Sequence, residues 1–447
     1  MAGGEPPGNE IAGISTDSRS TKTGELFFAL AGDKFDGHNF IGLTFENNAV
    51  AAVVSEKWFK YQGENFTGKG FIVVNDTLAA YQEFARYYAS KFPMTKIAIT
   101  GSSGKTTAKE CIYSALAKDF NVLRNKKSFN NHIGVPATLY EMRKEHNVLL
   151  SEMGTNHFGE LERLSYLVEP DMCVLINIGY AHLEFFKSLE GVKKAKLEIL
   201  SHANKDGTVV YNYDDPLLRD ISYPMGRSVS YGTEEGARVK GRVVDCDALA
   251  RYRFACEGKQ VQLPIPGRHN VSNALAAFCV GLELGVPSAN IRDGLESLAS
   301  VDQRMEVLKI RNLVLLNDSY NSNPDSCLAA LRTLADIQAP ANGRKIAVLG
   351  DMLELGDYAA KEHARMAEHV KDFHIDALFL LGKHTLATYK QAKRIGYKSA
   401  HHFFDKEELH LALREYVAEF DVVLVKGSRG MKMETVVESL AENSGRS

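Results

Sequence analysis

The stretch Lys96-Ile-Ala-Ile-Thr-Gly-Ser-Ser-Gly-Lys-Thr-Thr107 joins a short apolar run to a glycine-rich turn and the start of a helix. Residues 105–118 carry apolar side chains near helical spacing. Glycines let a backbone approach phosphate oxygens, and the exposed N–H groups at a helix N-terminus favour negative charge. The stretch therefore predicts a phosphate-binding loop between a buried strand and a helix.

Each residue of this loop has an expected role in binding a nucleotide. Lys105 would reach the β- and γ-phosphates, and the Thr106 hydroxyl would ligate Mg²⁺. The spacing is a compact variant of GxxxxGK[ST], because Ile99 occupies the first glycine position. The alternative is a Gly-Ser turn with a solvated lysine, which the flanking strand and helix disfavour. The other loop residues expected to contact the nucleotide are Gly101, Ser102, Ser103, Gly104 and Thr107.

The regions around the loop predict an α/β protein with three domains. Before Pro93, apolar runs at 25–30, 50–54 and 70–74 indicate short strands, and a helix is expected near 78–91. After the loop, continuous apolar runs bounded by helices favour a mostly parallel sheet covered on both faces. Those runs are 148–150, 172–178 and 208–211. From about Glu306, apolar runs that are each followed by a helix-like stretch predict a doubly wound domain. These runs are 345–350, 377–382 and 421–427.

Composition narrows the class of protein. A chain of 447 residues suggests about three domains. The formal net charge of −3 argues against a globally basic nucleic-acid binder. The six cysteines are scattered without a CxxC pair, which favours reduced thiols. The longest apolar stretch, around 172–181, is shorter than the roughly 18 residues of a spanning helix, and no signal sequence is visible. We therefore expect a cytoplasmic protein without membrane insertion.

Several motifs, in order along nearly the whole chain, resemble the Mur ligases of peptidoglycan synthesis. They are the TGSSGKTT loop, Ser151-Glu-Met-Gly-Thr-Asn-His157, Asn177-Ile-Gly-Tyr-Ala-His-Leu183, Ala195-Lys-Leu-Glu198, Gly267-Arg-His-Asn-Val-Ser-Asn273 and Asp318-Ser-Tyr-Asn-Ser-Asn-Pro324. The resemblance implies a small N-terminal α/β substrate domain (1–92), a central P-loop parallel-sheet ATPase domain (93–305) and a C-terminal Rossmann-like α/β domain (306–447).

The resemblance also implies an activity, which is ATP-dependent amide formation in cell-wall synthesis, and through it a part in cell shape and division. ATP would phosphorylate the carboxylate that ends a UDP-linked peptide, and an amine would attack the resulting acyl phosphate. The segments EMGTNHFGEL, DSYNSNPDS and Val348-Leu-Gly-Asp-Met-Leu-Glu-Leu-Gly356 favour UDP-N-acetylmuramoyl-tripeptide and D-alanyl-D-alanine as the two substrates. ATP and Mg²⁺ are the implied cofactors, and we expect a monomer.

The implied catalytic and metal-binding residues come from several of these motifs. Glu152 and Thr106 would ligate Mg²⁺, His182 would ligate a second metal, and Lys196 would be carbamylated by CO₂ to an anion that holds that metal's water shell. Lys105, Lys196 and His182 are the implied catalytic residues. Taken singly, Glu152 could be a surface carboxylate, His182 a structural histidine and Lys196 a solvated helical lysine.

The implied nucleotide and substrate contacts extend over all three domains. Asn273 would bind adenine, Arg304 the γ-phosphate and Asp318 the nucleotide, with ATP between the second and third domains and domain closure completing the site. His269 and Asn270 would shape a turn, and Asn321 and Asn323 could do the same before Pro324. The expected substrate-binding residues are Ser18 and Arg19 for the UDP end, Asn131, Asn156 and His157, and Arg429 for the dipeptide carboxylate.

Alternatives remain open for some of these residues and for the activity. Asp17 and Arg19 could be only a structural pair, and the loop that contains Arg429 could be only a helix start. The nearest rival activity is that of a Mur ligase that adds a single amino acid. A rival from another class is a nucleotide-switched binding module, which would not require a second metal.

Overall fold

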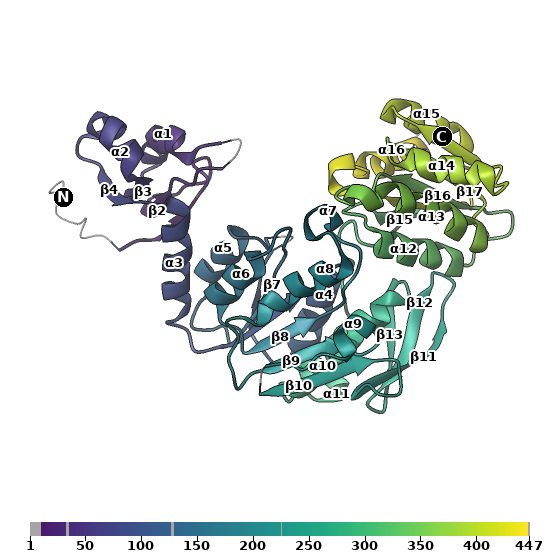
Figure 1. Cartoon of the computed structure of the whole chain (residues 1–447), viewed down its shortest axis with the longest axis horizontal. Coiled ribbons are helices and arrows are strands. Elements are labelled where there is room, and N and C mark those ends of the chain that lie inside the picture. The colour runs from purple at the N-terminus through teal and green to yellow at the C-terminus, as the bar shows by residue number, and fades with distance from the viewer. Residues whose placement is uncertain (1–9, 33–34, 127–128, 225, 446–447) are drawn as a thin grey trace. The chain divides into compact units, whose positions relative to one another are not determined.

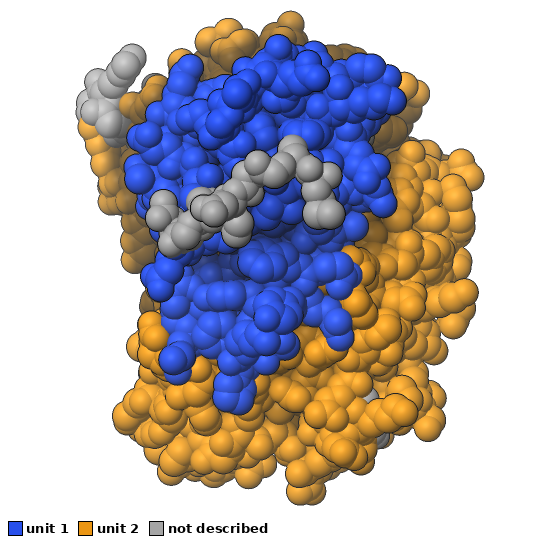
Figure 2. All heavy atoms as spheres, turned by 90° about the vertical axis from the view of Figure 1, so that its left-hand side faces the viewer, with its two compact units in different colours: residues 1–93, 132–144 blue, residues 94–131, 145–447 orange. Residues whose placement is uncertain are grey.

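The computed structural model of the chain describes residues 10–32, 35–126, 129–224 and 226–445 (Figure 1). Lys127 and Ser128, just before the expected substrate-binding residue Asn131, lie outside the described residues. Contacts divide the chain into two compact units, which Figure 2 shows in different colours. One unit contains the residues up to Pro93 together with His132–Lys144. The other contains Met94–Asn131 and Glu145–Ser447, and it holds two separate sheets.

The first unit is built on a four-stranded parallel sheet in the order β1-β2-β3-β4. Alternate residues of its strands pack on opposite faces: Phe27 and Val54 lie in one core cluster, whereas Phe28 and Val53 lie in another with Tyr81. The expected strands are confirmed, but the short β1 was not predicted. The elements are β1 (Gly13–Ser15), β2 (Glu25–Phe28), β3 (Ala51–Ser55), β4 (Gly70–Val74), α1 (Ile41–Glu46), α2 (Glu56–Gln62), α3 (Thr77–Ala89) and α5 (Gly134–Tyr140).

The second unit begins with a nine-stranded sheet in the order β13-β12-β11-β10-β9-β8-β5-β7-β6. Strands β5 to β10 are parallel, so their carboxyl ends form one edge. The elements are β5 (Thr95–Thr100), β6 (Val122–Arg124), β7 (Val148–Glu152), β8 (Met172–Leu175), β9 (Thr208–Asn212), β10 (Arg227–Gly232), α4 (Lys105–Leu116), α6 (Glu160–Val168), α7 (Leu183–Phe186), α8 (Leu189–Leu197), α9 (Pro216–Arg219), α10 (His269–Glu283) and α11 (Ser288–Glu296). The predicted parallel sheet is confirmed, and the phosphate loop follows β5, which lies between β8 and β7.

An antiparallel extension of this sheet was not predicted. It consists of β11 (Val239–Cys246), β12 (Arg251–Cys256) and β13 (Lys259–Pro266), at one end of the sheet (Figure 1). In β12, buried residues such as Tyr252 and Phe254 alternate with less buried arginines. This alternation is typical of a strand with one solvated face, and it differs from the continuous apolar runs that indicated the buried strands.

The third sheet has the strand order β14-β15-β19-β16-β17-β18. Apart from the antiparallel pair β14–β15, its neighbouring strands are parallel. The elements are β14 (Glu306–Ile310), β15 (Leu313–Asp318), β16 (Lys345–Gly350), β17 (Ala377–Leu381), β18 (Ala400–Phe403), β19 (Val422–Lys426), α12 (Pro324–Asp336), α13 (Ala359–Asp372), α14 (Thr385–Arg394), α15 (Lys406–Tyr416) and α16 (Glu434–Gly445). The three predicted strands of this region are confirmed as β16, β17 and β19. Within the described ranges, no helix is both long and apolar enough to cross a membrane.

Candidate active site

The phosphate loop lies at the carboxyl end of β5, and α4 begins at Lys105 directly after it. Gly104 has a φ of +75°, a left-handed conformation that favours glycine. A Cβ atom at Gly104 would lie 3.0 Å from the Oδ1 of Asn273, so the predicted adenine-binding residue lies against the loop. Glycine at this position therefore permits both the left-handed turn and the close approach of Asn273 in α10.

Asn177, which follows β8, holds the loop through both ends of its side-chain amide. Its Oδ1 accepts hydrogen bonds from the N–H groups of Ser102 and Ser103 at 3.0 and 2.9 Å. Its Nδ2 donates to the carbonyl and the hydroxyl of Ser103, at 3.2 Å in each case. The first N–H groups of α4 have no acceptor within the helix, so an anion at this point can receive them.

Lys105 folds back over the loop, where its Nζ donates to the carbonyl of Gly101 at 2.8 Å. Burial lowers the pKa of Lys105, and the Glu152 carboxylate opposes that shift. The charge of Arg304 adds to the lowering of the Lys105 pKa, so Arg304 is close enough to act on the same group. Lys105, Glu152 and Arg304 thus share one electrostatic environment, as a site for a charged phosphate chain requires.

Thr106 and Glu152 meet as the metal assignment expects. The Thr106 hydroxyl donates to the Oε2 of Glu152 at 2.8 Å, and both residues are buried. Glu152 ends β7 opposite Ile99 of β5, which places its carboxylate beside the loop. Asn130 donates from Nδ2 to the other carboxylate oxygen at 2.8 Å, and the Nζ of buried Lys109 lies 3.7 Å from Oε2.

These oxygens fit Mg²⁺, although the described residues contain no group of three or more His, Cys, Asp or Glu that could hold a metal. Mg²⁺ is bound in nucleotide sites by one or two protein oxygens together with phosphate oxygens and waters. The Thr106–Glu152 pair supplies one hydroxyl and one carboxylate beside the phosphate loop. A dedicated cage of protein ligands is not required.

Lys196 lies in α8 with its side chain completely buried, so it is not a solvated surface lysine. Its Nζ has no hydrogen-bond partner among the described residues. Burial lowers the pKa of Lys196 well below its usual value; the charge of Lys105 adds to this effect, and Glu160 and Glu198 oppose it. Lys196 therefore lies near Lys105 as a buried amine that is easily deprotonated.

His182 is placed differently from the other predicted metal ligands. It precedes α7 with a φ of +54°, and its Nδ1 lies 2.6 Å from the Oε2 of Glu354. Glu354 belongs to the third-sheet region, and its hydrogen bond with His182 lowers the pKa of Glu354. His182 is thus held between two parts of the second unit.

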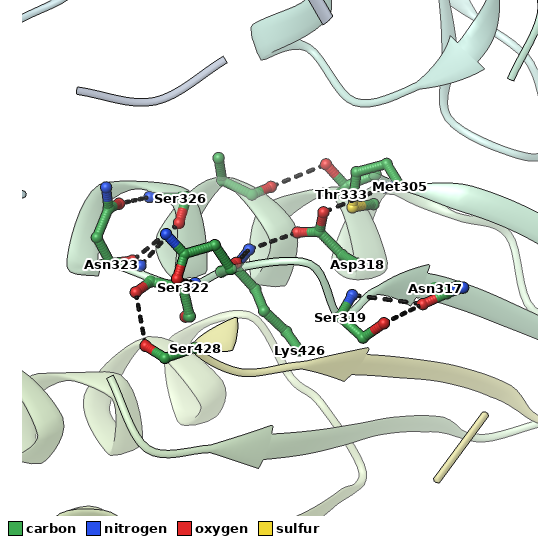
Figure 3. Close-up of polar contacts among 12 residues, drawn as sticks. Met305, Asn317, Asp318, Ser319, Ser322, Asn323, Ser326, Thr333, Lys426 and Ser428 are labelled. Atoms are coloured by element: carbon green, nitrogen blue, oxygen red, sulfur yellow. Dashed lines mark hydrogen bonds and ion pairs between the residues drawn. The ribbon is translucent and has the colours of Figure 1, made fainter. Parts of the chain in front are cut away.

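Asp318, which is partly buried, and Lys426, which is buried, form an ion pair at the carboxyl ends of β15 and β19 (Figure 3). The Nζ of Lys426 donates to Asp318 Oδ2 at 2.6 Å and to the carbonyl of Asn321 at 2.8 Å. The other oxygen of Asp318 accepts from the N–H of Met305 at 3.1 Å. Asp318 therefore already has two partners, and any contact with the nucleotide would be made from this fixed carboxylate. The side chain of Asn323 caps α12, which fits its alternative role as a turn residue.

Arg304 and Arg429 both lie near the ring of Tyr320. The guanidinium carbons are 4.2 and 5.5 Å from the ring centre, within the range of cation–π contacts. Arg429 also donates to Gln303 at 3.2 Å and to Glu434 at 3.1 Å. The residue predicted for the γ-phosphate and the residue predicted for the dipeptide carboxylate therefore lie beside one ring.

The remaining predicted substrate residues lie in different parts of the chain. In the first unit, Arg19 pairs with Asp17 at 2.6 Å and lowers the pKa of Asp17 to about 2, while Ser18 is buried. In the second unit, Asn131 and Asn156 are exposed. The ring of His157 lies 4.4 Å from that of Phe185.

A cavity of about 420 Å³ lies beside the loop, beyond the carboxyl ends of β8 and β9. Ligands of α/β folds bind in this position. Its lining includes Ser103, Asn177, Asn212, Asp215 and Asp325.

Sequence reasoning missed four residues that contact the predicted site: Lys109, Asn130, Asn177 and Glu354. Asn177 and Glu354 lie inside motifs that had been noted for other reasons, Lys109 follows the phosphate-loop motif, and Asn130 precedes Asn131. Asn130 and Asn131 are adjacent and chemically identical, so only the fold shows that Asn130 bonds Glu152. Asn177 is a polar residue near the end of the predicted run 172–178, and that position was the available signal.

Comparisons with known proteins match one family along nearly the whole chain. Family models match at residues 10–88 (Mur ligase family, catalytic domain), 99–281 (Mur ligase middle domain) and 303–429 (Mur ligase, glutamate ligase domain). The UDP-N-acetylmuramoyl-tripeptide–D-alanyl-D-alanine ligase of Bacillus subtilis is 34% identical over 97% of this chain and 94% of its own length. The Escherichia coli protein of the same name is 34% identical over 98% and 96%.

Solved structures of MurF proteins are similar to this chain over nearly its full length. MurF from Acinetobacter baumannii has a TM-score of 0.88 at 31% identity, covering 98% of this chain and 94% of that one. MurF ligase from Thermotoga maritima in complex with ADP has a TM-score of 0.83 at 27% identity, covering 98% of both chains. The likeness thus extends over the first unit and over both sheets of the second.

Proposed function

The chain belongs to the Mur ligase family, and we propose that it joins D-alanyl-D-alanine to UDP-N-acetylmuramoyl-tripeptide in peptidoglycan synthesis, using ATP. Relatives that carry the name of this activity match the chain over nearly its full length, which supports these two substrates. The observation that carries the chemistry is the Thr106–Glu152 pair beside Lys105, with the buried amine of Lys196 nearby.

A carboxylate is a poor electrophile at neutral pH, so it must first gain a leaving group. In the proposed reaction the terminal carboxylate of the tripeptide attacks the γ-phosphorus of ATP, and ADP leaves. The amine of D-alanyl-D-alanine then attacks the acyl phosphate, the amide forms, and phosphate and a proton are released. The chain must hold the nucleotide and the carboxylate in attack geometry and stabilise the spreading negative charge.

The residues of the loop supply the binding part of this task. The N–H groups at the start of α4, with Lys105, would hold the phosphate chain, and Arg304 would contact the γ-phosphate. Thr106 and Glu152 would hold Mg²⁺, which when bound offsets the charge between ATP and the incoming carboxylate. Asn273, which lies against Gly104, would contact adenine, and Asp318 would contact the nucleotide from the third domain. The ADP named in the Thermotoga maritima structure supports the use of ATP.

We further propose that Lys196 is carbamylated. Its buried Nζ, with no partner among the described residues, is suited to react as a neutral amine. A nitrogen–carbon bond to CO₂ forms and one proton leaves, which turns the amine into an anion. That anion would help hold a second metal with His182, next to the Lys105 charge.

The substrates would contact further residues in all parts of the chain. Arg429 would take the dipeptide carboxylate, and the UDP-linked substrate would contact Ser18, Arg19, Asn131, Asn156 and His157. We propose domain boundaries near residues 92 and 305, a monomer, and a cytoplasmic location, where ATP and UDP-linked precursors are available.

The proposed activity is tested by product mass. The protein is incubated with ATP, Mg²⁺ and UDP-N-acetylmuramoyl-tripeptide carrying either diaminopimelate or lysine. The amines offered are D-alanyl-D-alanine, diaminopimelate, lysine and glutamate. We expect ADP, phosphate and a pentapeptide product only with D-alanyl-D-alanine. A product with a single amino acid, offered with its own acceptor peptide, would assign a different member of the family. ATP turnover that ignores every acid and amine would indicate a nucleotide switch.

A further inference from the structure

We propose that Glu354 is a positioning residue that orients His182 and thereby makes one side of the active site depend on the third domain. The inference rests on the proposed function for the role of His182. Glu354 belongs to the segment Val348–Gly356, for which the proposed mechanism has no use so far. This segment continues from β16 into the turn that precedes α13.

Glu354 and His182 are joined by side-chain and backbone contacts together. The Oε2 of Glu354 lies 2.6 Å from His182 Nδ1, and the carbonyl of Glu354 accepts from the N–H of Glu184 at 3.0 Å. Gly356 approaches the same segment so closely that a Cβ there would lie 3.2 Å from the Cα of Glu184. These contacts fix the turn against the start of α7 in one register.

Both partners have a backbone conformation that is rare for their residue types. The φ of His182 is +54° and that of Glu354 is +63°, both in the left-handed region. Residues other than glycine seldom adopt this region, and such outliers persist where the surrounding structure determines them and cluster at functional sites. Here two of them face each other through one short hydrogen bond.

The contact also determines which nitrogen of His182 is available. A carboxylate only accepts hydrogen bonds, so Nδ1 carries the proton of this contact, and in the neutral imidazole Nε2 then keeps its lone pair. A carboxylate on one ring nitrogen is the usual partner of a histidine that ligates a metal through the other. Glu354 therefore holds His182 in the tautomer that its proposed role requires. The two residues are 172 positions apart, so this tautomer depends on the third domain lying against the central one.

The ordinary alternative is a partly exposed ion pair that only adds to the contact between two domains. A control variant separates a positioning role from a merely structural one. Tyr358, in the same turn region, donates from its hydroxyl to the carbonyl of Lys187 at 3.3 Å. Tyr358→Phe removes a contact between the same two segments without touching His182. Glu354→Ala removes the partner of His182, and Glu354→Gln keeps an acceptor oxygen without the charge.

The first readout is the tautomer of His182, measured by nitrogen-15 NMR on the protein without nucleotide or metal. His182→Asn identifies the signal. We expect wild-type His182 to be protonated at Nδ1, Tyr358→Phe to match it, and Glu354→Ala to shift toward the Nε2-protonated form. An unchanged signal in Glu354→Ala, or the same shift in Tyr358→Phe, would overturn the proposal. This readout needs no ligase activity, so it stands apart from a failure of the proposed function.

The second readout is steady-state kinetics with ATP, UDP-N-acetylmuramoyl-tripeptide and D-alanyl-D-alanine. We expect Glu354→Ala to lower kcat by about 10- to 100-fold, with little change in the KM for ATP. Glu354→Gln should retain more of kcat than Glu354→Ala, and Tyr358→Phe should retain nearly all of it. Equal losses in Glu354→Ala and Tyr358→Phe would mean that the pair only joins the domains.

Discussion

Lys196 combines complete burial with the absence of any hydrogen-bond partner among the described residues. A buried ammonium without a partner is costly, so such a group either loses its proton or gains a compensating charge. The neighbouring Lys105 makes the charged form still less favourable. The proposed carbamate would remove both the unpaired ammonium and its repulsion by Lys105, because it would place an anion beside a cation.

Lys196→Ala is expected to lower the rate of ligation by about 100-fold or more, since the variant cannot form the proposed anion that would support the second metal. Wild-type protein freed of CO₂ should lose activity and regain it on adding bicarbonate, and a carbamate signal should appear by carbon-13 NMR. Lys194→Ala is the matched control, because Lys194 is an exposed lysine of the same helix. If Lys196→Ala kept full activity and bicarbonate had no effect on either protein, Lys196 would not be carbamylated.

The loop between β5 and α4 owes its conformation to a neighbouring strand as well as to its own glycines. The carboxyl end of β8 brings Asn177 beside it, where one amide makes four hydrogen bonds to Ser102 and Ser103. These bonds fix the conformation of the loop through contacts within the protein. A preorganised loop loses less conformational freedom on binding.

Asn177→Ala is expected to weaken ADP binding by roughly 10- to 100-fold, because the loop loses bonds with a net value of about 1–3 kcal/mol. Isothermal titration calorimetry with MgADP measures the change. Asn204→Ala is the control, since Asn204 bonds Asp171 at the opposite end of β8. Equal affinities for wild type and Asn177→Ala would mean that the loop forms without this amide.

The sequence predicted those elements that a short stretch of residues identifies by its own composition. Buried parallel strands such as β16 and β19 are continuous apolar runs, and the glycine turn before Lys105 marks the loop. The strand β12 was missed because its burial alternates, and β1 was missed because it has only three residues. The choice between Asn130 and Asn131 depends on the direction of a turn, which local composition does not determine.

The proposed site draws on parts of the chain that only the complete fold brings together. Glu354 meets His182 across 172 positions, and Lys426 meets Asp318 across 108. The order of motifs predicted the family and its three domains, but neither of these pairs. The first contact follows from how the third-sheet region lies against the central one, and the second follows from the pairing of β15 with β19 within the third sheet. No short stretch of sequence encodes either arrangement.

The central claim is that the peptide carboxylate is activated by taking the γ-phosphoryl group of ATP. The measurement is oxygen transfer from a UDP-N-acetylmuramoyl-tripeptide whose terminal carboxylate carries oxygen-18, with ATP, Mg²⁺ and D-alanyl-D-alanine. Mass spectrometry then follows the label in phosphate, AMP and peptide. We predict one labelled oxygen in inorganic phosphate for each amide formed, because that oxygen bridges carbon and phosphorus in the acyl phosphate. Label in AMP, or amide formation with unlabelled phosphate, would contradict the account.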